Sequence, residues 1–200
     1  GAIKLELMPE VINFNDEVID PLKLKGMTDS ISHRGPDGEG QWIEDNIGIG
    51  HRRLSIIDLS SAGNQPMLSS DQRYVLSYNG EVYNFKELRG ELKNLGYSFK
   101  SQTDSEVVLY ALVEWKTDAL LKFNGMFSLS FWDRLEKKLI LARDRYGIKP
   151  LYFARQGNLF AFGSEQKAIT SLPEFKQSIN KSALFEYFTF QNIFTNQTFL

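Results

Sequence analysis

Short apolar runs separated by turn residues dominate the chain and predict a protein rich in β-strands. Runs of Val, Leu, Ile and Phe predict buried strands at residues 73–78, 125–133 and 138–144. Two further pairs of runs predict hairpins, namely 41–44 with 47–57 around Asp45-Asn46, and 151–155 with 159–163 around residues 156–158. Asp, Asn and Gly suit these turns because they tolerate a left-handed backbone.

Two helices are predicted between the strands because apolar residues recur there at spacings of three and four. The first spans residues 84–96 and the second spans 103–115, and in each a capping residue, Asn84 or Thr103, precedes a Glu by three positions. Shorter helices are predicted near residues 118–123 and 181–188. The pattern gives an α+β fold, in which two stacked sheets between helical layers would bury this many apolar strands.

The chain contains no cysteine among its 200 residues, of which 42% are hydrophobic. This absence excludes disulfide scaffolds, thiolate metal sites, iron–sulfur clusters and a thiol nucleophile supplied by the chain itself. His33 and His51 have neither His-x-x-x-His spacing nor cysteine partners, so we predict no metal site and expect both to act as structural hydrogen-bonding groups. Nucleophile elbows of the Gly-x-Ser-x-Gly type and phosphate-binding loops are also absent from the sequence.

The formal charge of −2, with both signs interspersed, gives no electrostatic footprint for nucleic acid or an anionic membrane. The sequence has neither an apolar run long enough to span a membrane nor the pattern of a signal peptide. A cytoplasmic location is therefore expected.

Four polar clusters interrupt the apolar segments and hold the candidate chemistry. The segment 33–38, His-Arg-Gly-Pro-Asp-Gly, is explained equally well as a turn and as a functional loop. In the strand 47–57, alternation places Arg53 on one face with Ser55 and Ile57, so its guanidinium is predicted to lie with an apolar surface. A half-buried guanidinium needs a carboxylate partner, either from the protein or from a ligand.

The third cluster, residues 78–84, places Asn79 and Gly80 between a strand and a helix. Asn-Gly is the commonest two-residue turn signal, and a turn is the prediction from this pair by itself. The alternative is an oxyanion hole, because an Asn amide and a Gly backbone N–H at a strand end supply two donors to a carbonyl oxygen. In the fourth cluster, residues 102–106, Asp104 either stabilises a helix dipole or binds an ammonium group.

These groups together suit an amino acid whose side-chain carbonyl is attacked. Arg53 supplies a cation for an α-carboxylate, and Asp104 supplies an anion for an α-ammonium group. Asn79 and Gly80 supply donors for a developing oxyanion.

Eight motifs, taken in order, resemble the glutaminase domain of glutamine-dependent asparagine synthetases, which are class II glutamine amidotransferases with the N-terminal nucleophile fold. The match covers about residues 11–200. The motifs are His33-Arg-Gly-Pro-Asp-Gly, Arg53-Leu-Ser-Ile-Ile-Asp, Asn64-Gln-Pro-Met, Tyr78-Asn-Gly-Glu-Val-Tyr-Asn, Thr103-Asp-Ser-Glu, Phe123-Asn-Gly-Met-Phe, Ala142-Arg-Asp-Arg-Tyr-Gly-Ile-Lys-Pro-Leu-Tyr and Phe162-Gly-Ser-Glu-Gln-Lys-Ala.

The resemblance implies a four-layer αββα sandwich of two stacked antiparallel sheets. It also implies that an N-terminal cysteine thiol attacks the glutamine side-chain amide, which releases ammonia and leaves a thioester that water hydrolyses. By position, Arg53 matches the ligand of the glutamine carboxylate and Asp104 the ligand of its amino group. Asn79 and Gly80 match the oxyanion hole, and Glu81 matches a further position of the substrate pocket.

The resemblance further implies a second domain that is absent from this chain. Residues 1–180 are expected to form the glutaminase-type domain, and 181–200 the start of the connection to a synthetase domain. That domain would hold ATP and Mg²⁺, adenylate aspartate and let ammonia displace AMP to give asparagine, whereas no cofactor is expected in this chain. A homodimer is a further partner left open.

The chain departs from this family at the nucleophile. Family members begin Cys-Gly-Ile, followed by an apolar strand that reaches an Asn-Phe-like pair, here residues 13–14. Counting back from this pair without a gap places the nucleophile near Glu6, whereas aligning the termini sets residues 1–3 against Cys-Gly-Ile. Neither alignment supplies a thiol. Pro9 in this segment is expected only at an edge position, because proline cannot donate to a ladder.

The resulting hypothesis is a glutamine pocket that cannot hydrolyse glutamine by the covalent route. Loss of the nucleophile should remove essentially all of that route, because an oxyanion hole alone supplies on the order of 10²–10³ in rate. One alternative is a pseudo-amidotransferase module that binds glutamine, or nothing, while its partner domain uses free ammonia. Another is an amidotransferase domain whose partner acts on a surface-polysaccharide sugar acid instead of aspartate.

Overall fold

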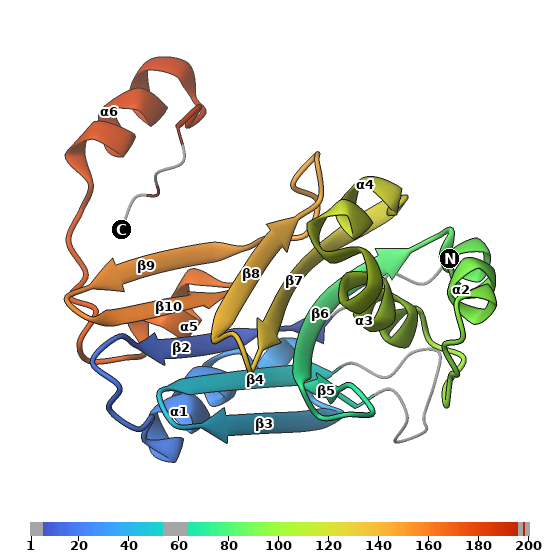
Figure 1. The fold of residues 1–200 in the computed structure, drawn as a ribbon. Coiled ribbons are helices and arrows are strands. Elements are labelled where there is room, and N and C mark those ends of the chain that lie inside the picture. Colours follow the sequence, from blue (N-terminus) through green and yellow to red (C-terminus); the bar gives the residue numbers. More distant parts are fainter. Residues whose placement is uncertain (1–5, 54–63, 196–197, 199–200) are drawn as a thin grey trace.

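Two stacked antiparallel sheets with helices on both outer faces form the fold (Figure 1). The structure is a computed structural model that describes residues 6–53, 64–195 and 198. The expected α+β sandwich of four layers is confirmed. Sheet A contains β1 (Glu6–Leu7), β2 (Pro9–Asn13), β3 (Gly38–Glu44), β4 (Ile47–Arg53), β9 (Tyr152–Gln156) and β10 (Leu159–Gly163). Sheet B contains β5 (Met67–Leu68), β6 (Tyr74–Val82), β7 (Gly125–Asp133) and β8 (Lys138–Arg143).

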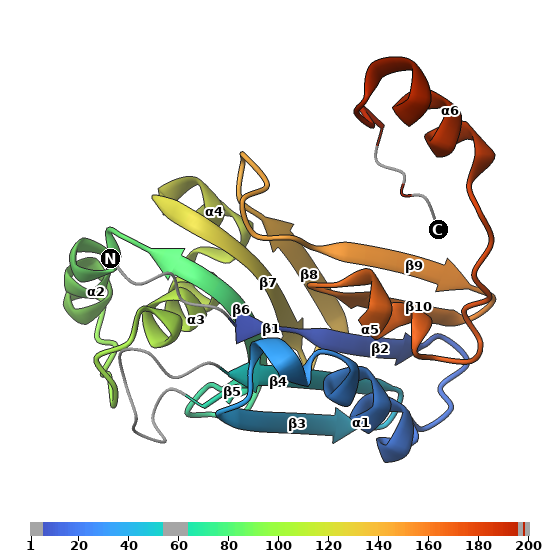
Figure 2. The same cartoon turned by 180° about the vertical axis from the view of Figure 1, so that it is seen from behind.

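Helices cover the outer face of each sheet, which the view from behind in Figure 2 shows for sheet A. Sheet A is covered by α1 (Pro21–Ser30) and α5 (Gln166–Thr170). The helices beside sheet B are α2 (Phe85–Asn94), α3 (Asp104–Trp115) and α4 (Ala119–Lys122). The short 3₁₀ turns η1 (Ser32–Arg34) and η3 (Lys116–Asp118) connect elements, and α6 (Lys181–Phe190) projects beyond β9 and β10.

Strand alternation divides the apolar residues among three layers of core. Along β6, Leu76 and Tyr78 pack with the buried faces of α2 and α3, whereas Val75 faces the space between the sheets. The apolar part of that inner space consists of Ile12, Ile47, Ile49, Val75 and Trp132. Toward the other end of β6, Ser77 and Asn79 occupy the same inward-facing positions as Val75, so the inner layer changes from apolar to polar along the strand.

β1 and β2 follow one register against β4, from Glu6 opposite Arg53 to Ile12 opposite Ile47. Within this segment, β2 lies inside sheet A, between β4 and β10. The expectation that Pro9 lies at an edge position was wrong: Pro9 is the first residue of an interior strand, where the missing N–H is tolerated. The ladder is supported beside it, because Ser164 N–H donates to the Met8 carbonyl and Met8 N–H donates to Ser164 Oγ.

The strands predicted at 125–133 and 159–163 have the observed bounds of β7 and β10. The strand predicted at 73–78 instead continues to Val82, so the turn expected at Asn79-Gly80 was wrong. Nine residues of β7 pair with β6 through this region, and the ladder overrides the local turn preference. Residues 54–57 of the predicted strand 47–57 lie outside the described residues.

The predicted helices were found, but their capping boxes were wrong. Asn84 precedes α2 without capping it, because its side chain bonds instead with the Lys122 carbonyl and the Asn124 N–H. Thr103 precedes α3 and likewise makes no capping bond from its side chain. Gly96 follows α2 with φ +96°, as the sequence predicts for a residue at a helix C-terminus.

Candidate functional site

Arg53 is the last residue of β4 and lies at the rim of the space between the sheets. Its side chain is half-buried, and its Nη1 donates to Asn64 Oδ1 at 3.0 Å. On the strand before it, Arg52 points to the opposite face, as period-two alternation requires. That Arg53 shares a face with Ser55 and Ile57 stays a prediction, because residues 55 and 57 lie outside the described residues.

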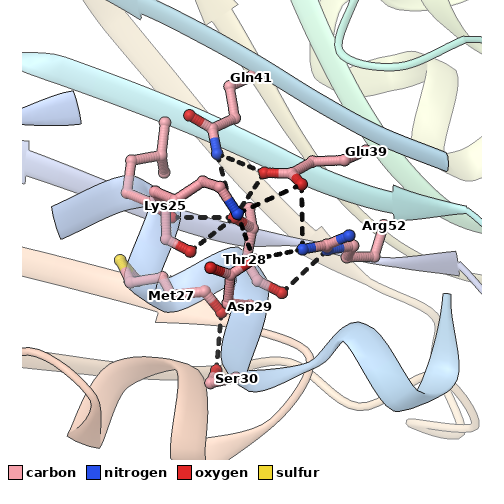
Figure 3. Close-up of polar contacts among 9 residues, drawn as sticks. Lys25, Met27, Thr28, Asp29, Ser30, Glu39, Gln41 and Arg52 are labelled. Carbon is pink, nitrogen blue, oxygen red and sulfur yellow. Dashed lines mark hydrogen bonds and ion pairs between the residues drawn. The ribbon is translucent and has the colours of Figure 1, made fainter. Parts of the chain in front are cut away.

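Arg52 clamps this end of β4 to α1 on the outer face of sheet A (Figure 3). Its guanidinium donates to the Thr28 carbonyl at 3.0 Å and to Asp29 Oδ1 at 2.6 Å, and it lies 3.0 Å from Glu39 Oε2. Lys25 bonds to the same Asp29 carboxylate at 2.5 Å. Hydrogen bonding to Lys25, assisted by the charge of Arg52, lowers the pKa of Asp29 from its usual value. The cluster fixes the backbone that carries Arg53.

The segment 33–38 forms a wall beside Arg53. Asp37 N–H donates to the Arg53 carbonyl at 3.1 Å, and Pro36 forms a bridge with the same residue. Gly35 lies so close to β4 that an added Cβ would be 2.6 Å from Arg52 Cβ. The segment is thus both a turn and a part of the site's frame, and its glycine is required by the close approach.

Gly80 presents its backbone N–H at the edge of β6 that faces away from β7. Alternate residues of a strand direct their N–H groups to the same side. Tyr78 N–H donates to Gln65 Oε1 at 2.6 Å and Val82 N–H donates to Asp104 Oδ2 at 3.1 Å, both on the side away from β7. The N–H of Gly80, between them, points the same way, and none of the described strands pairs with β6 at that point.

The absence of a side chain at Gly80 is required by packing against β7. A Cβ at this position would lie 2.4 Å from the Met126 carbonyl oxygen and 2.7 Å from Phe127 Cα. Asn79 is 3% exposed and occupies the inward face of β6, like Ser77, whose Oγ contacts the Gly50 carbonyl of β4 at 3.5 Å. The carboxamide of Asn79 and the N–H of Gly80 are therefore adjacent donors on one strand.

Asp104 is the first residue of α3 and connects that helix to β6. Its Oδ2 accepts hydrogen bonds from Tyr78 O–H at 2.8 Å and from Val82 N–H at 3.1 Å. The carboxylate also lies at the helix N-terminus, where the macrodipole favours a negative charge. The position of Asp104 at the start of α3 fits the helix-dipole interpretation, while ammonium binding stays a prediction. The half-buried carboxylate lies beside the strand that carries Gly80.

Two buried charged residues hold the loop that precedes Asp104. Glu106 accepts from the backbone N–H groups of Lys100 at 2.9 Å and Ser101 at 2.7 Å. Arg89, from α2, donates to the carbonyls of Ser101 at 2.8 Å and Thr103 at 2.9 Å. The loop is held through its donors by an anion and through its acceptors by a cation, which fixes the start of α3.

Glu81 is half-buried on β6 and pairs with Met126 of β7. By alternation it shares the inward face with Asn79. Arg53, Asn79, Gly80, Glu81 and Asp104 therefore lie on three elements, and the contacts of Asn64-Gln65 with Arg53 and Tyr78 connect β4 to β6 and α3. Sequence reasoning gave no role to Gln65 or Tyr78. Their signal was the position of both residues inside the motifs, next to residues with an assigned role.

Glu6, the position reached by counting back from Asn13-Phe14, lies with its backbone opposite Arg53 in the β1–β4 ladder. β1 also contacts β6. The gapless alignment thus places the nucleophile position on a strand that contacts both β4, which carries Arg53, and β6, which carries Asn79 and Gly80. The alternative alignment falls on residues 1–3, outside the described residues.

Glu10 is a fully buried carboxyl group between the sheets. Ser130 Oγ donates to its Oε1 at 2.5 Å, and its Oε2 has no hydrogen-bond partner among the described residues. Burial raises the pKa of Glu10 well above its usual value, and the bonds from Ser130 and Ser77 oppose that shift. The folded chain therefore favours the protonated form of Glu10 more strongly than the unfolded chain does.

His33 is exposed and lies with Nε2 3.0 Å from Lys167 Nζ, whereas His51 is buried at 1% exposure. Within residues 6–53, 64–195 and 198, no group of three or more metal-binding side chains converges. Over the same residues, none of the helices has the length and apolar character of a membrane span.

The family model described as "Glutamine amidotransferase domain" matches residues 10–200. The chain belongs to this family. Two asparagine synthetases [glutamine-hydrolyzing] of Bacillus subtilis are similar to it. Number 3 is 40% identical over 81% of this chain and 26% of its own length, and number 2 is 43% identical over 80% and 21%. A putative asparagine synthetase of Methanocaldococcus jannaschii is 36% identical over 89% of this chain and 38% of its own length.

The amidotransferase domain described here therefore spans about a fifth to two fifths of the length of these relatives. Among solved structures, glutamine phosphoribosylpyrophosphate amidotransferase from B. subtilis superposes with a TM-score of 0.71. The match covers 83% of this chain and 43% of that chain at 19% sequence identity, and it shows the shared N-terminal nucleophile fold. The chain is thus a glutamine amidotransferase domain of the asparagine synthetase-like type.

Proposed function

We propose that this amidotransferase domain binds glutamine at the rim between the sheets but, as a chain without cysteine, does not hydrolyse it through a thioester. In the proposal, Arg53 binds the α-carboxylate and Asp104 binds the α-ammonium group. The amide of Asn79 and the N–H of Gly80 bind the side-chain carbonyl oxygen, and Glu81 lines the pocket.

The observation that carries the proposal is the edge of β6 that faces away from β7, where none of the described strands pairs with Gly80. Gly80 N–H lies between two backbone groups that are held by Gln65 and Asp104, so it is presented in a fixed direction. A fixed donor beside an anion and near a cation suits a zwitterion with a carbonyl group at its other end. Glutamine has that chemistry, and the Bacillus subtilis relatives are named as glutamine-hydrolysing enzymes.

The covalent route requires a thiolate, and no residue of the chain supplies one. The proposed nucleophile position, Glu6, carries a carboxylic acid residue in its place. We infer that this domain acts with a synthetase region that accepts ammonia and binds ATP and Mg²⁺. The relatives, of which this domain matches only a part, are named asparagine synthetases. An alternative is that the domain is a binding module beside a region that uses free ammonia, which the missing thiol favours.

Calorimetry with glutamine, and an assay for released glutamate, test the proposal on the full chain. We expect saturable binding and no thioester-dependent turnover. Arg53→Ala should abolish the binding, and Arg155→Ala, at an exposed arginine of the edge strand β9, should not. Absence of binding in the wild-type chain would reject the glutamine pocket, and turnover at the rate of a thiol enzyme would reject the defect.

Asp104→Asn removes the negative charge proposed to bind the α-ammonium group but keeps an acceptor oxygen for the hydrogen bonds of Asp104 to β6. An amide oxygen still accepts from Tyr78 O–H and Val82 N–H, so β6 and α3 stay connected. The negative charge that would bind the ammonium group is lost. We expect weaker glutamine binding with a thermal unfolding midpoint close to that of the wild type, and equal affinities would remove Asp104 from the pocket.

A further inference from the structure

The dipeptide Asn64-Gln65 bridges the two sheets at the candidate site. The carboxamide of Gln65, a residue 4% exposed, bonds with both backbone groups of Tyr78. Tyr78 N–H donates to Oε1 at 2.6 Å, and Nε2 donates to the Tyr78 carbonyl at 2.8 Å. The side chain thereby takes the place of a neighbouring strand, because it satisfies the two groups that a strand would pair.

The backbone of Gln65 lies against the other sheet. Gly40 of β3 is so close that an added Cβ would be 1.8 Å from the Gln65 carbonyl oxygen and 2.9 Å from its carbonyl carbon. Gln65 thus has its main chain packed on sheet A and its side chain bonded to sheet B. A shift of either sheet at this end would have to displace a buried, hydrogen-bonded residue.

Asn64 extends the bridge to the proposed carboxylate ligand. Its Oδ1 accepts from Arg53 Nη1 at 3.0 Å. Because Asn64 and Gln65 are consecutive, the direction of the guanidinium and the position of the β6 edge depend on the same short backbone segment. Gly80 follows Tyr78 by two residues on that edge, so its N–H is the next one to point toward the site.

We propose that Asn64 and Gln65 are positioning residues of the glutamine site, with Asn64 orienting Arg53 and Gln65 aligning the β6 edge that presents the Gly80 N–H. Neither residue is assigned contact with the ligand. The inference rests on the proposed function for its ligand. Its structural half concerns the chain without ligand and is measured separately.

The first test is Gln65→Met in the full chain, which keeps the side-chain length and removes both hydrogen-bonding atoms. We expect faster amide hydrogen exchange at Tyr78 and a displaced amide resonance of Gly80, both without ligand. Glutamine affinity should fall at least about tenfold, which corresponds to the loss of about one hydrogen bond between the protein and glutamine. Gln41→Met is the matched control, because Gln41 bonds on the outer face of sheet A (Figure 3) and its loss should leave all three readouts unchanged.

Gln65→Glu adds a pH-dependent readout that a merely structural role would not produce. An ionised carboxylate accepts from Tyr78 N–H but cannot donate to the Tyr78 carbonyl, whereas the protonated acid does both. The affinity of this variant for glutamine, divided by that of the wild type at the same pH, should therefore rise as the pH is lowered. The variant also keeps the test available if Gln65→Met does not fold.

Asn64→Ala tests the other half of the dipeptide. The Tyr78 exchange rate and the Gly80 resonance should stay as in the wild type, while glutamine affinity falls. In an Arg53→Lys background, whose ammonium group cannot reproduce the guanidinium geometry, Asn64→Ala should cause a smaller additional loss. Equal losses in both backgrounds would reject the role of Asn64 in orienting Arg53.

The outcomes separate this inference from the proposed function. If the wild-type chain does not bind glutamine, the proposed function fails, and the ligand-free Tyr78 and Gly80 readouts still decide whether Gln65 aligns the edge. If Gln65→Met leaves those two readouts unchanged, the alignment is rejected. If it changes them but glutamine affinity stays within twofold of the wild type, the positioning role is rejected while the pocket stands.

Discussion

Glu106→Gln is a direct perturbation of the loop that carries Asp104. The carboxylate, on a residue 6% exposed, accepts three hydrogen bonds, from Lys100 N–H at 2.9 Å, Ser101 N–H at 2.7 Å and Ser101 Oγ at 2.7 Å. Glutamine has one acceptor oxygen, which can serve the two donors of Ser101. Its NH₂ group then faces the N–H of Lys100, and that bond is lost.

The expected destabilisation follows from this count. One hydrogen bond to a charged group contributes about 1.5–3 kcal/mol, and the two remaining bonds weaken when the acceptor becomes neutral. The free energy of unfolding should therefore fall by about 3 kcal/mol, which lowers the Tm of a 200-residue domain by about 6–12 °C. Because the loop also positions Asp104 at the start of α3, the affinity of the chain for glutamine should fall as well.

Urea and thermal unfolding followed by circular dichroism measure this effect. Glu87→Gln is the matched control: Glu87 is an exposed residue of α2, and its substitution should change the unfolding free energy by less than about 0.5 kcal/mol. A loss below about 1 kcal/mol in Glu106→Gln, with an unchanged urea dependence, would refute the reasoning that the carboxylate holds the loop.

Three further predictions concern other parts of the sandwich. Burial raises the pKa of Glu10 above its usual 4.5, so the stabilising contribution of Glu10 is complete below pH 4.5 and is lost as the pH rises through the raised pKa. Glu10→Gln should therefore gain stability relative to the wild type as the pH rises above about 4.5. Parallel pH–stability curves of the two proteins would contradict this. Gly80→Ala should cost about 1–3 kcal/mol by overpacking and abolish glutamine binding, whereas Gly90→Ala, with no atom within 4 Å of the new Cβ, should be neutral or stabilising in chemical denaturation. A chain shortened to begin at position 6 and carrying Glu6→Cys should gain glutamine-dependent release of glutamate, and glutamine binding without such release would show that the nucleophile does not belong at this position.

Periodicity in the sequence was enough to predict the main strands and helices of this fold. β7 and β10 have the bounds that their apolar runs predict, because short runs of large apolar residues suit a buried strand in any neighbourhood. The helix α1 was not predicted, and the strand β2 was expected only from the resemblance and not from periodicity. Both elements are buried by β4, β10 and α5, which lie farther along the chain, so the local sequence pattern does not predict them.

The candidate site was predictable as residue types but not as an arrangement. Charge and hydrogen-bonding chemistry indicated Arg53, Asp104, Asn79 and Gly80, and the resemblance suggested glutamine. The roles of Tyr78 and Gln65 were not predictable, because their bonds connect residues 13 or more positions apart. Arg52 and Arg53 are neighbours of the same type, and only packing shows that one is committed to α1 and Glu39.

The sequence by itself determined that these 200 residues contain no thiol, since no fold can supply an atom that the residues lack. It also determined the alternation that sends Arg52 and Arg53 to opposite faces of β4. The tertiary structure decided that Asn79-Gly80 is a strand edge instead of a turn, because pairing with β7 outweighs a preference confined to adjacent residues. It also decided which amide holds that edge, because Gln65 reaches Tyr78 only after the two sheets have stacked.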